Sequence, residues 1–402
     1  MINVKTVYIY LFTLVGCATN NEKIEIVDVN KQIDKLAINN SEPVKDIKPY
    51  SNIELINEIK VLIYKSPVKL NISVLDPTIN NKNYLGDYNI SCKKQNTDAT
   101  CLMKNILTNS TLIISEKTIS IKSDGFIKVN SKTLREKISI TISKNKLLVI
   151  NHLPIKNYTI AVAASEMPIS AHNEAIKAQL VAARNYAISV AKENKNNPYH
   201  LLPDQYDQVF RGANYENPKL AKLYKEIKNN FLVYNNQILK TFYCSSTGAS
   251  IITPEKAWGN KTKHNGAYDN LISHWDKNDQ GNNWQIKLST KIGHMFNLNR
   301  LKEIKIMNQE FLEVKSIKVT DINNTSKIYS ISKFKQTIKP FKLPSHEFHV
   351  TKTQKGFSLK GRGWGHSVGL SQRGAMAMAN DNLKYQEILK FYYPNSQLIS
   401  IN

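Results

Sequence analysis

The hydrophobic pattern of this chain changes its period at Pro168. Between residues 56 and 150, β-branched side chains occupy alternating positions, as in TLIISEKTISIKS and KISITISKNKLLVI, with Asn, Pro and Gly between the runs. Alternation of this kind predicts half-buried strands, and the second segment predicts a hairpin turning at Lys144-Asn145. The first part of the chain is therefore predicted to be a β-rich module.

The segment 170–194 after Pro168 has the period of a helix. Its apolar residues recur at steps of four and three, which places them on one face, and Ser170 is the expected N-cap. These apolar positions are Ile176, Leu180, Ala183, Ala187 and Val190. The switch from strand period to helix period predicts an α+β fold rather than an all-β one.

The remaining sequence mixes both kinds of element. PKLAKLYKEIKNNF predicts a helix, NQILKTFYC and LEVKSIKVT predict strands, and GFSLK predicts a strand before a glycine-rich stretch. Helices are predicted near 371–380 and at LKYQEILKFYY. Because 402 residues exceed one ordinary core, we expect two folded parts, a β-rich module over 56–150 and a second domain over 151–402.

The N-terminus predicts export. Lys5 precedes an apolar run from Val7 to Val15 that is too short to span a bilayer but suits a signal peptide over residues 1–17. LVGC at 14–17 resembles a bacterial lipoprotein processing box, so we expect a lipid on Cys17 and a membrane anchor. An ordinary signal peptide with an incidental cysteine is the alternative. Residues 18–55 are predicted to be a tether.

The formal net charge is +23 at pH 7. A polyanionic partner is one interpretation: nucleic acid, an anionic membrane or an acidic cell-wall polymer. Lysines scattered over solvated surfaces are the other interpretation. Export and the absence of any nucleic-acid-binding motif disfavour nucleic acid.

Three further cysteines have different expectations. Cys92 and Cys101 flank a polar stretch that can turn back on itself, so we expect a local disulfide in an exported chain. Cys244 is then left without a cysteine partner, and a nucleophilic role for it needs a histidine supplied by the fold. The spacing of cysteines and histidines does not match a zinc site, so no metal is expected.

Glu166 follows the apolar run AVAA and precedes Met167-Pro168. Because Pro168 restricts Met167, Glu166 is expected at an element boundary, where a cleft can form. Apolar surroundings raise a carboxyl pKa, which is what a general acid in glycoside cleavage needs. A solvated charge that complements the N-terminus of the following helix is the alternative.

Arg184 lies on the edge of the apolar stripe of this helix. Its guanidinium is expected either to reach a substrate carboxylate or to pair with a surface acid such as Glu174.

Two loops are rich in groups that bind sugars. TFYCSSTGASIITPEKAWGN predicts a strand followed by a hydroxyl-rich turn at Ser245, Ser246 and Thr247, and it offers Trp258 as a flat surface or as a core residue. GRGWGHSVGLSQRGAMAMA lacks the G-x-G-x-x-G spacing and the Lys of phosphate-binding loops, which excludes a Walker loop and disfavours any nucleotide site. Its glycines instead indicate close backbone approach.

These segments, together with LPIKNYTIAVAASEMPISAHNEAIKAQLVAARNYA and YQEILKFYYPNSQL, resemble the SpoIID/LytB family in order and approximate spacing over about residues 140–400. The resemblance implies an α+β, SpoIID-like catalytic core that acts on peptidoglycan. It places the family's catalytic acid on Glu166. It also implies a sugar cleft held by Arg184, the Ser245–Thr247 turn and Trp258, with Trp364, His366, Ser371 and Gln372 on the glycine-rich loop.

Members of the family resemble lytic transglycosylases that cut glycan strands stripped of stem peptides, and others are described as amidase enhancers. The resemblance therefore implies either an enzyme giving 1,6-anhydromuramyl ends or a peptidoglycan-binding activator of an N-acetylmuramoyl-L-alanine amidase. Neither needs a cofactor.

The chain departs from the family pattern in several places. WGHGVGMSQYGA of the family reads WGHSVGLSQRGA here, which changes Ser367, Leu370 and Arg373. The hydroxyl-rich turn ends in Gly248-Ala249 instead of Gly-Gly, and Cys244 stands where His, Phe or Tyr is common. These departures affect the expected details of substrate binding rather than the fold.

Overall fold

The computed structural model describes residues 53, 55–67, 70–215, 217–259, 263–277 and 279–401. The predicted signal peptide 1–17, the lipidation site Cys17 and nearly all of the tether 18–55 lie outside the described residues. Helices and strands are both abundant, which confirms the predicted α+β class. Among the described helices, none has the length and apolar character that a bilayer crossing demands.

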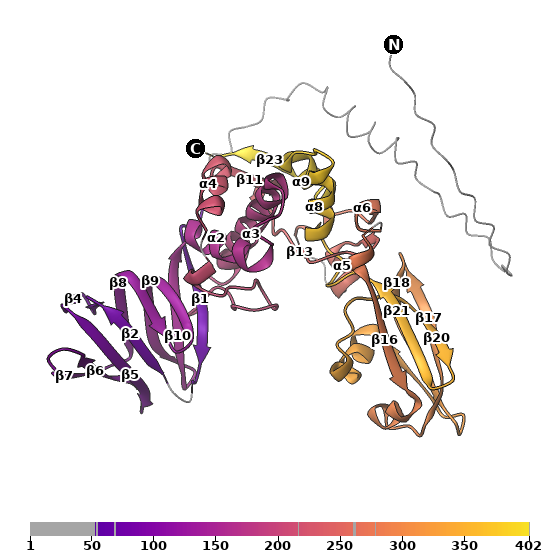
Figure 1. Ribbon diagram of the computed structural model, residues 1–402, viewed down its shortest axis with the longest axis horizontal. Helices are drawn as coiled ribbons and strands as arrows, with labels where there is room; N and C mark the ends of the chain where they lie inside the picture. The colour runs from indigo at the N-terminus through magenta and orange to yellow at the C-terminus, as the bar shows by residue number, and fades with distance from the viewer. Residues whose placement is uncertain are drawn as a thin grey trace, which may run out of the picture. The chain divides into compact units, whose positions relative to one another are not determined.

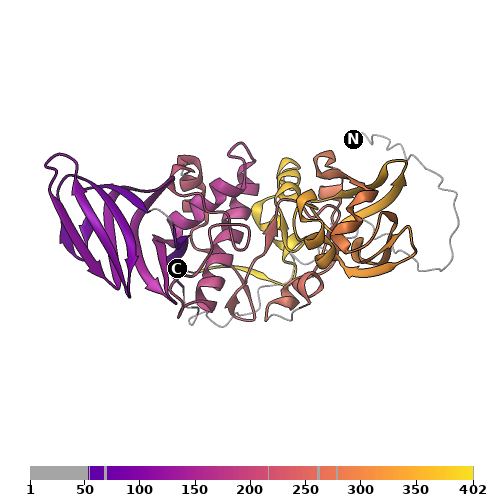
Figure 2. The ribbon, with the colours of Figure 1, turned by 90° about the horizontal axis from the view of Figure 1, so that it is seen from below.

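The first part is a twisted antiparallel sheet, drawn in indigo and purple in Figures 1 and 2. Along its main path the strand order is β1-β10-β9-β8-β2-β5-β6-β7, with β3 and β4 at the side. In β8 alternate residues are buried, as period two predicts. The strands are β1 (Glu58–Lys65), β2 (Asn71–Leu75), β3 (Thr78–Ile79), β4 (Lys82–Asn83), β5 (Asp87–Gln95), β6 (Asp98–Asn105), β7 (Thr111–Glu116), β8 (Thr118–Val129), β9 (Lys132–Ser143) and β10 (Lys146–Pro154).

The predicted hairpin and the join to the helices are both visible in this sheet. β9 and β10 pair about Lys144 and Asn145, whose φ angles of 46° and 62° form the turn. β10 then runs without a linker into the first helix after the sheet. One hydrophobic core contains residues of the sheet together with residues of the next two helices, so these elements pack as one body.

The helical part is built on α2 (Ile155–Glu166) and α3 (Asn173–Glu193), which pack against each other. α3 begins two residues later than an N-cap at Ser170 predicts. Its N-cap is His172, whose Nδ1 accepts a hydrogen bond from Glu174 N at 3.3 Å, in place of the expected Ser170.

Burial of α3 also extends beyond the predicted stripe. All five predicted apolar positions are buried, and so is most of the rest of the helix, because α3 contributes to two hydrophobic cores. Alanines on both sides let neighbouring elements approach closely.

The other elements of the helical part are short. The predicted helix near 371–380 is confirmed as α8, with Ser371 as its N-cap, and the terminal helix is confirmed as α9. The helices are α4 (Pro218–Ile227), α5 (Pro254–Trp258), α6 (His274–Lys277), α8 (Gln372–Asn380) and α9 (Tyr385–Tyr392). The strands are β11 (Asn230–Tyr234), β12 (Gln237–Ile238), β13 (Tyr243–Cys244), β14 (Ser250–Ile251), β15 (Leu271–Ile272), β22 (Leu370–Ser371) and β23 (Gln397–Ser400).

Residues 283–362 form a further β-rich part with its own hydrophobic core. One three-stranded sheet has the order β16-β21-β20, and the other has the order β17-β18-β19. The elements are β16 (Asn283–Ser289), β17 (Leu301–Glu310), β18 (Glu313–Asp321), β19 (Ser326–Ser330), α7 (Ile331–Thr337), β20 (Glu347–Thr353) and β21 (Gly356–Arg362). The glycine-rich loop leaves the end of β21 and returns to the helical part at β22 and α8.

Candidate functional site

Glu166 is the last residue of α2. Met167 ends the helix with extended backbone angles of φ −124° and ψ 146°, the region to which a following proline restricts it. The element boundary expected from Pro168 is therefore where Glu166 lies, and residues 158–163 earlier in the helix are buried.

The carboxylate of Glu166 is held by groups distant in sequence. Oε1 accepts a hydrogen bond from the backbone N–H of Val209 at 2.8 Å, and Oε2 accepts one from Nε2 of Gln372 at 3.4 Å. Burial raises the pKa of Glu166, while these two hydrogen bonds and the nearby charge of Arg211 oppose the rise. The net pKa is above the ordinary value, so more of this carboxyl is protonated near neutral pH than of a solvated glutamate.

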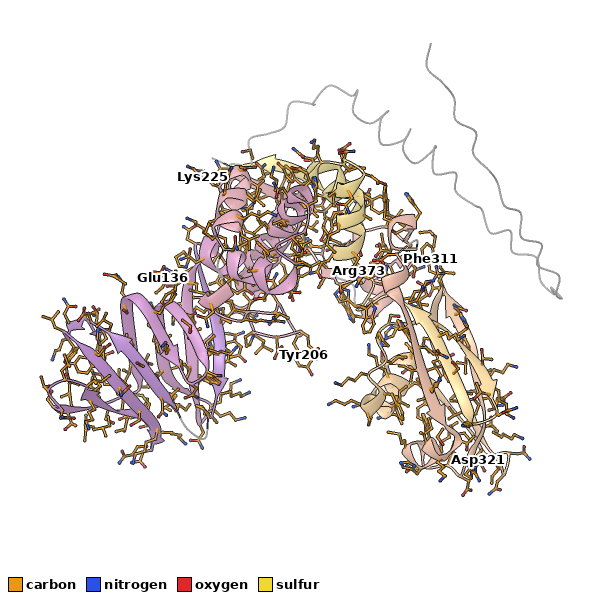
Figure 3. All side chains as sticks on the ribbon, in the orientation of Figure 1. Glu136, Tyr206, Lys225, Phe311, Asp321 and Arg373 are labelled. Atoms are coloured by element: carbon orange, nitrogen blue, oxygen red, sulfur yellow. A yellow bond between two sulfur atoms is a disulfide. The ribbon has the colours of Figure 1, made fainter. Side chains whose placement is uncertain are left out.

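A pocket of about 360 Å³ lies beside the loop that holds Glu166. Its walls include Tyr206, Tyr243, Trp258 and His366. Tyr206 projects from the loop, as Figure 3 shows, and is 77% exposed. Glu166 does not itself line the pocket but is joined to it through this loop.

Gln208 makes that join. Its Nε2 donates to the hydroxyl of Tyr243 at 2.8 Å, and its Oε1 accepts from the hydroxyl of Tyr158 at 3.1 Å. Val209, the next residue, binds Glu166. Gln208 and Val209 thus connect Glu166 to the pocket wall. Neither residue was predicted from the sequence, because residues 203–212 show no periodic pattern and no motif.

Trp258 and His366 meet in this pocket with ring centroids 5.2 Å apart. Trp258 is 44% exposed, so part of its surface is free for a sugar ring. Burial lowers the pKa of His366 to about 4, and its Nδ1 accepts a hydrogen bond from Val368 N at 3.1 Å. His366 is therefore neutral near pH 7. Trp364 is also 44% exposed but does not line this pocket.

The hydroxyl-rich segments converge on Asp276 instead of on an open cleft. Ser246 Oγ donates to Oδ1 of Asp276 at 2.9 Å, Ser273 Oγ donates to Oδ2 at 3.0 Å, and Ser371 Oγ also donates to Oδ1. Asp276 is fully buried, and burial raises its pKa while the hydroxyl donors lower it. Nothing in the short segment HWDK distinguishes this residue in sequence.

This network changes the expectation for several predicted sugar-binding residues. Ser246, Thr247 and Ser371 are fully buried, whereas Ser245 is exposed. Asp276 ties the turn to the N-terminus of α8, and Ser246 forms a β-bridge with Trp364. In this structure only Ser245 of the turn presents its side chain to solvent.

Arg184 does not reach a cleft. Its side chain is 1% exposed and donates to the backbone carbonyls of Ile227, Lys228 and Asn230, which satisfies the C-terminal end of α4. Its guanidinium also lies 4.3 Å from the ring centre of Phe231. The substrate contact expected from the sequence is replaced by a structural one, because the carbonyls that end α4 lie beside this face of α3.

The remaining changed or unassigned positions also have partners. Arg373 forms an ion pair with Asp279 at 2.8 Å. Cys92 and Cys101 form a disulfide between paired positions of β5 and β6. Cys244 is buried, and burial raises the pKa of its thiol to about 12, which keeps it protonated and poorly nucleophilic.

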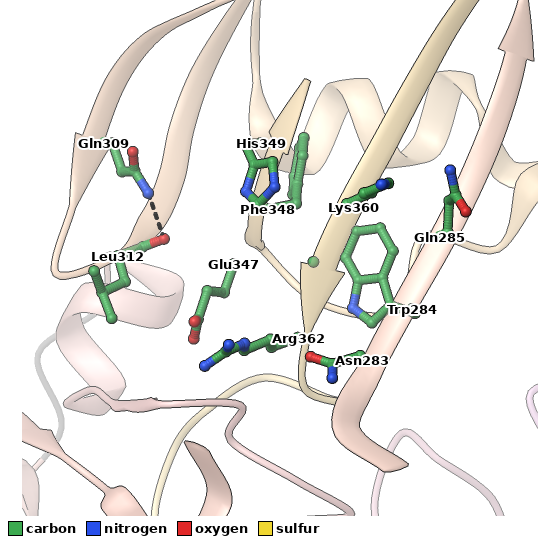
Figure 4. A pocket seen from close by; sticks show the side chains of 11 residues that line it. Asn283, Trp284, Gln285, Gln309, Leu312, Glu347, Phe348, His349, Lys360 and Arg362 are labelled. Carbon is green, nitrogen blue, oxygen red and sulfur yellow. Dashed lines mark hydrogen bonds between the residues drawn. The ribbon is translucent and has the colours of Figure 1, made fainter. Parts of the chain in front are cut away.

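A larger pocket of about 630 Å³ lies on the sheet β16-β21-β20 (Figure 4). None of the predicted site residues lines it, although Gly361 and Arg362 of the glycine-rich stretch do. Within the described residues, no group of three or more His, Cys, Asp or Glu side chains is arranged to hold a metal ion.

Comparisons with known proteins agree with the motifs. Residues 143–234 match the family model described as stage II sporulation protein, SpoIID. An uncharacterized protein of Brachyspira hyodysenteriae is 26% identical over 74% of this chain and 84% of its own length. Stage II sporulation protein D of Bacillus subtilis is 26% identical over 65% of this chain and 79% of its own length.

A further relative has a different name. The amidase enhancer of Bacillus subtilis is 26% identical over 60% of this chain but only 40% of its own length. The family match includes Glu166, Arg184 and the whole of α2 and α3. The chain is therefore a relative of the SpoIID/LytB proteins, as its motifs indicate, and residues 143–234 carry the SpoIID match.

Proposed function

We propose that this chain acts at the bacterial cell wall as a peptidoglycan lytic transglycosylase with Glu166 as its single acid and base. The SpoIID match and the sporulation relatives support the cell-wall role. One observation carries the enzymatic assignment. Glu166 is a half-buried carboxyl with a raised pKa, joined by one loop to a pocket with aromatic walls.

The chemistry works with one carboxyl. Protonated Glu166 gives its proton to the glycosidic oxygen as the bond to C1 of muramic acid breaks. The resulting carboxylate then accepts the proton of the sugar's own 6-hydroxyl as that oxygen bonds to C1. The product is a 1,6-anhydromuramyl end, and Glu166 is protonated again. A hydrolase needs a second carboxyl to handle water or a covalent intermediate.

The other residues of the pocket would orient the glycan. Trp258 and Tyr206 offer exposed aromatic surfaces for sugar rings, and neutral His366 can form hydrogen bonds without competing as an acid. Ser245 does not line this pocket, but it is the exposed hydroxyl of the turn and is available to a substrate outside it. Lipidation at Cys17 and export to the cell envelope are part of the proposal.

The test is digestion of purified glycan strands, with and without stem peptides, by wild type and by Glu166→Gln. Removing the proton donor should lower the rate by about 10²-fold or more, because general acid–base catalysis contributes about that much. Mass spectrometry identifies the ends. Anhydro ends formed equally well by the variant would remove Glu166 from the mechanism, and reducing ends would indicate a muramidase.

The relative named amidase enhancer and the charge of +23 favour a second function, a non-enzymatic activator that binds peptidoglycan and a cell-wall amidase. The two functions are distinguished by mixing this chain with an N-acetylmuramoyl-L-alanine amidase. If the chain is an activator, it increases the amidase's release of stem peptides, and the Glu166→Gln variant increases that release equally well. Glycan cutting with no gain in amidase activity excludes this alternative.

A further inference from the structure

The larger pocket has a side-chain pattern set by strand register. Side chains at alternate positions of a strand lie on one face, so paired positions form rows across the sheet. In the first row Arg362 of β21 pairs with Asn283 of β16 and with Glu347 of β20. In the second row Lys360 pairs with Gln285 and with His349. All six of these residues line the pocket.

The two cations of this pocket are engaged to different degrees. Among the described residues, no side-chain hydrogen bond or ion pair of Lys360 or Arg362 is found, but the charge of Arg362 is close enough to Glu347 to oppose the rise of that carboxyl's pKa. Figure 4 shows the side chains of Arg362 and Glu347 pointing toward one another. Glu347 is already engaged, since its Oε2 accepts a hydrogen bond from Ala249 N at 3.0 Å. The pocket therefore presents two cations against one partly satisfied carboxylate.

The composition of this β-rich part is strongly cationic. Residues 283–362 contain 14 Lys and 2 Arg against 5 Asp and Glu, a larger ratio of cations to anions than the 55 to 32 of the whole chain. The pocket volume of about 630 Å³ is within the range of ligand sites, about 300–1,000 Å³. Amide side chains of Asn283 and Gln285 lie next to the cations, and amides bind sugar hydroxyls.

The pocket is connected to the motif residues. Glu347 binds the turn that follows Ser245–Thr247, and Gly248 packs against the backbone of Arg362. The stretch 360–366 contributes Lys360 and Arg362 to this pocket and His366 to the smaller one. Lys360 and Arg362 end β21 and His366 lies in the loop that follows it, so one short stretch of chain contributes to both pockets.

We propose that the larger pocket is a second glycan subsite in which Lys360 and Arg362 bind the carboxylate of an acidic sugar and the neighbouring amides bind its hydroxyls. The proposal rests on the proposed function, because the muramic acid of a glycan strand carries a carboxylate when no peptide is attached. Guanidinium and ammonium groups recognise carboxylates through charge-assisted hydrogen bonds.

The test measures binding instead of cleavage, with the full chain carrying Glu166→Gln so that strands stay intact. Soluble glycan fragments with free carboxylates are compared with the same fragments after the carboxylates are converted to amides. Adding Lys360→Gln and Arg362→Gln should weaken binding of the carboxylate fragments by about tenfold or more, the scale of one lost charge-assisted contact. Binding of the amidated fragments should not change.

Matched variants separate recognition from general charge. Lys305→Gln removes one exposed charge from the same β-rich part outside the pocket, and its effect should stay within about twofold. Arg362→Lys keeps the charge and should recover part of the affinity. Thermal unfolding of each variant confirms that it is folded.

Equal binding by the double variant and by Lys305→Gln overturns the subsite, and so does an equal loss for the amidated fragments. Tighter binding of a polyglycerol phosphate than of carboxylate glycans overturns the choice of ligand. Failure of the proposed function is detected in a separate assay, in which the wild-type protein forms no anhydro ends from glycan strands. If the wild type does form anhydro ends but the variant with Lys360→Gln and Arg362→Gln binds glycan fragments normally, only the subsite inference is refuted.

Discussion

Gln372 donates a hydrogen bond from Nε2 to Oε2 of Glu166 at 3.4 Å, although 206 positions separate the two residues. The contact joins the first residue of α8, in the glycine-rich stretch, to the last residue of α2, which precedes Met167-Pro168. The glycine-rich stretch therefore acts on a carboxyl that is distant in the chain. The hydrogen bond favours the ionised form of Glu166 and so limits how far burial raises its pKa.

Gln372→Ala should move the alkaline limb of the pH–activity profile to higher pH. Activity requires protonated Glu166, so it falls as pH rises through the raised pKa, and loss of this hydrogen bond raises that pKa further. The shift should be smaller than about one pH unit, because a single long neutral hydrogen bond contributes less than about 1 kcal/mol. Profiles of kcat/KM for wild type, Gln372→Ala and the exposed control Gln354→Ala measure it. A shift to lower pH would contradict the proposed role of Gln372.

Asp276→Ala should destabilise the protein strongly. The change leaves the buried hydroxyls of Ser246, Ser273 and Ser371 without their acceptor and should lower the free energy of unfolding by about 3 kcal/mol. Urea unfolding measures the loss. Asp124→Ala is the control, since Asp124 is exposed on the first sheet and should change stability by less than about 0.5 kcal/mol.

Asp276→Asn should alter the pH dependence of stability. The pKa of Asp276 is raised by burial, so its protonated form contributes stability that is complete below the ordinary value of 3.8 and is lost as pH rises through the raised pKa. The Asn variant has no such loss. The stability of wild type relative to the Asn variant should therefore fall as pH rises from about 4 toward neutral. A difference that grows with pH would contradict the raised pKa.

Arg184→Leu should lower stability and leave KM of the folded protein unchanged. The guanidinium satisfies backbone carbonyls at the end of α4, and its loss leaves them buried without donors, at a cost of about 3 kcal/mol. Arg373→Ala is the matched arginine control, because its half-exposed ion pair with Asp279 should contribute under about 1 kcal/mol. A raised KM with unchanged unfolding would restore the substrate-binding role that the sequence suggested for Arg184.

Cys244 should resist alkylation in the folded protein. Burial raises its pKa to about 12, so almost no thiolate is present at pH 8, and the side chain is 7% exposed. Iodoacetamide followed by peptide mapping should find Cys244 unmodified in native protein and modified after unfolding. Rapid native alkylation with loss of activity would return Cys244 to the list of possible nucleophiles.

Local pattern was sufficient for much of the fold. Alternation predicted the strands of the first sheet, including the β9–β10 hairpin at Lys144 and Asn145, and the steps of four and three predicted the buried face of α3. Pro168 predicted that Glu166 lies at the end of an element. Each of these depends on neighbours within a few positions, where backbone sterics and side-chain period act directly.

The roles of Arg184, Ser246 and Ser371 could not be predicted in the same way. A polar side chain in a motif can face substrate or a buried partner, and its own neighbours in sequence do not distinguish the two. Arg184 meets carbonyls more than 40 positions away, and the two serines meet at Asp276, for which the sequence holds no signal. The pairing of Lys360 and Arg362 with β16 and β20 likewise depends on register.

Local period, proline geometry and motif order were enough to predict the α+β class, the boundary at Glu166 and the relation to the SpoIID/LytB proteins. Which polar side chains remain exposed and which become buried partners could be read only from the folded chain. Burying a hydroxyl, a guanidinium or a carboxylate requires compensating hydrogen bonds, and long-range packing determines where those partners lie.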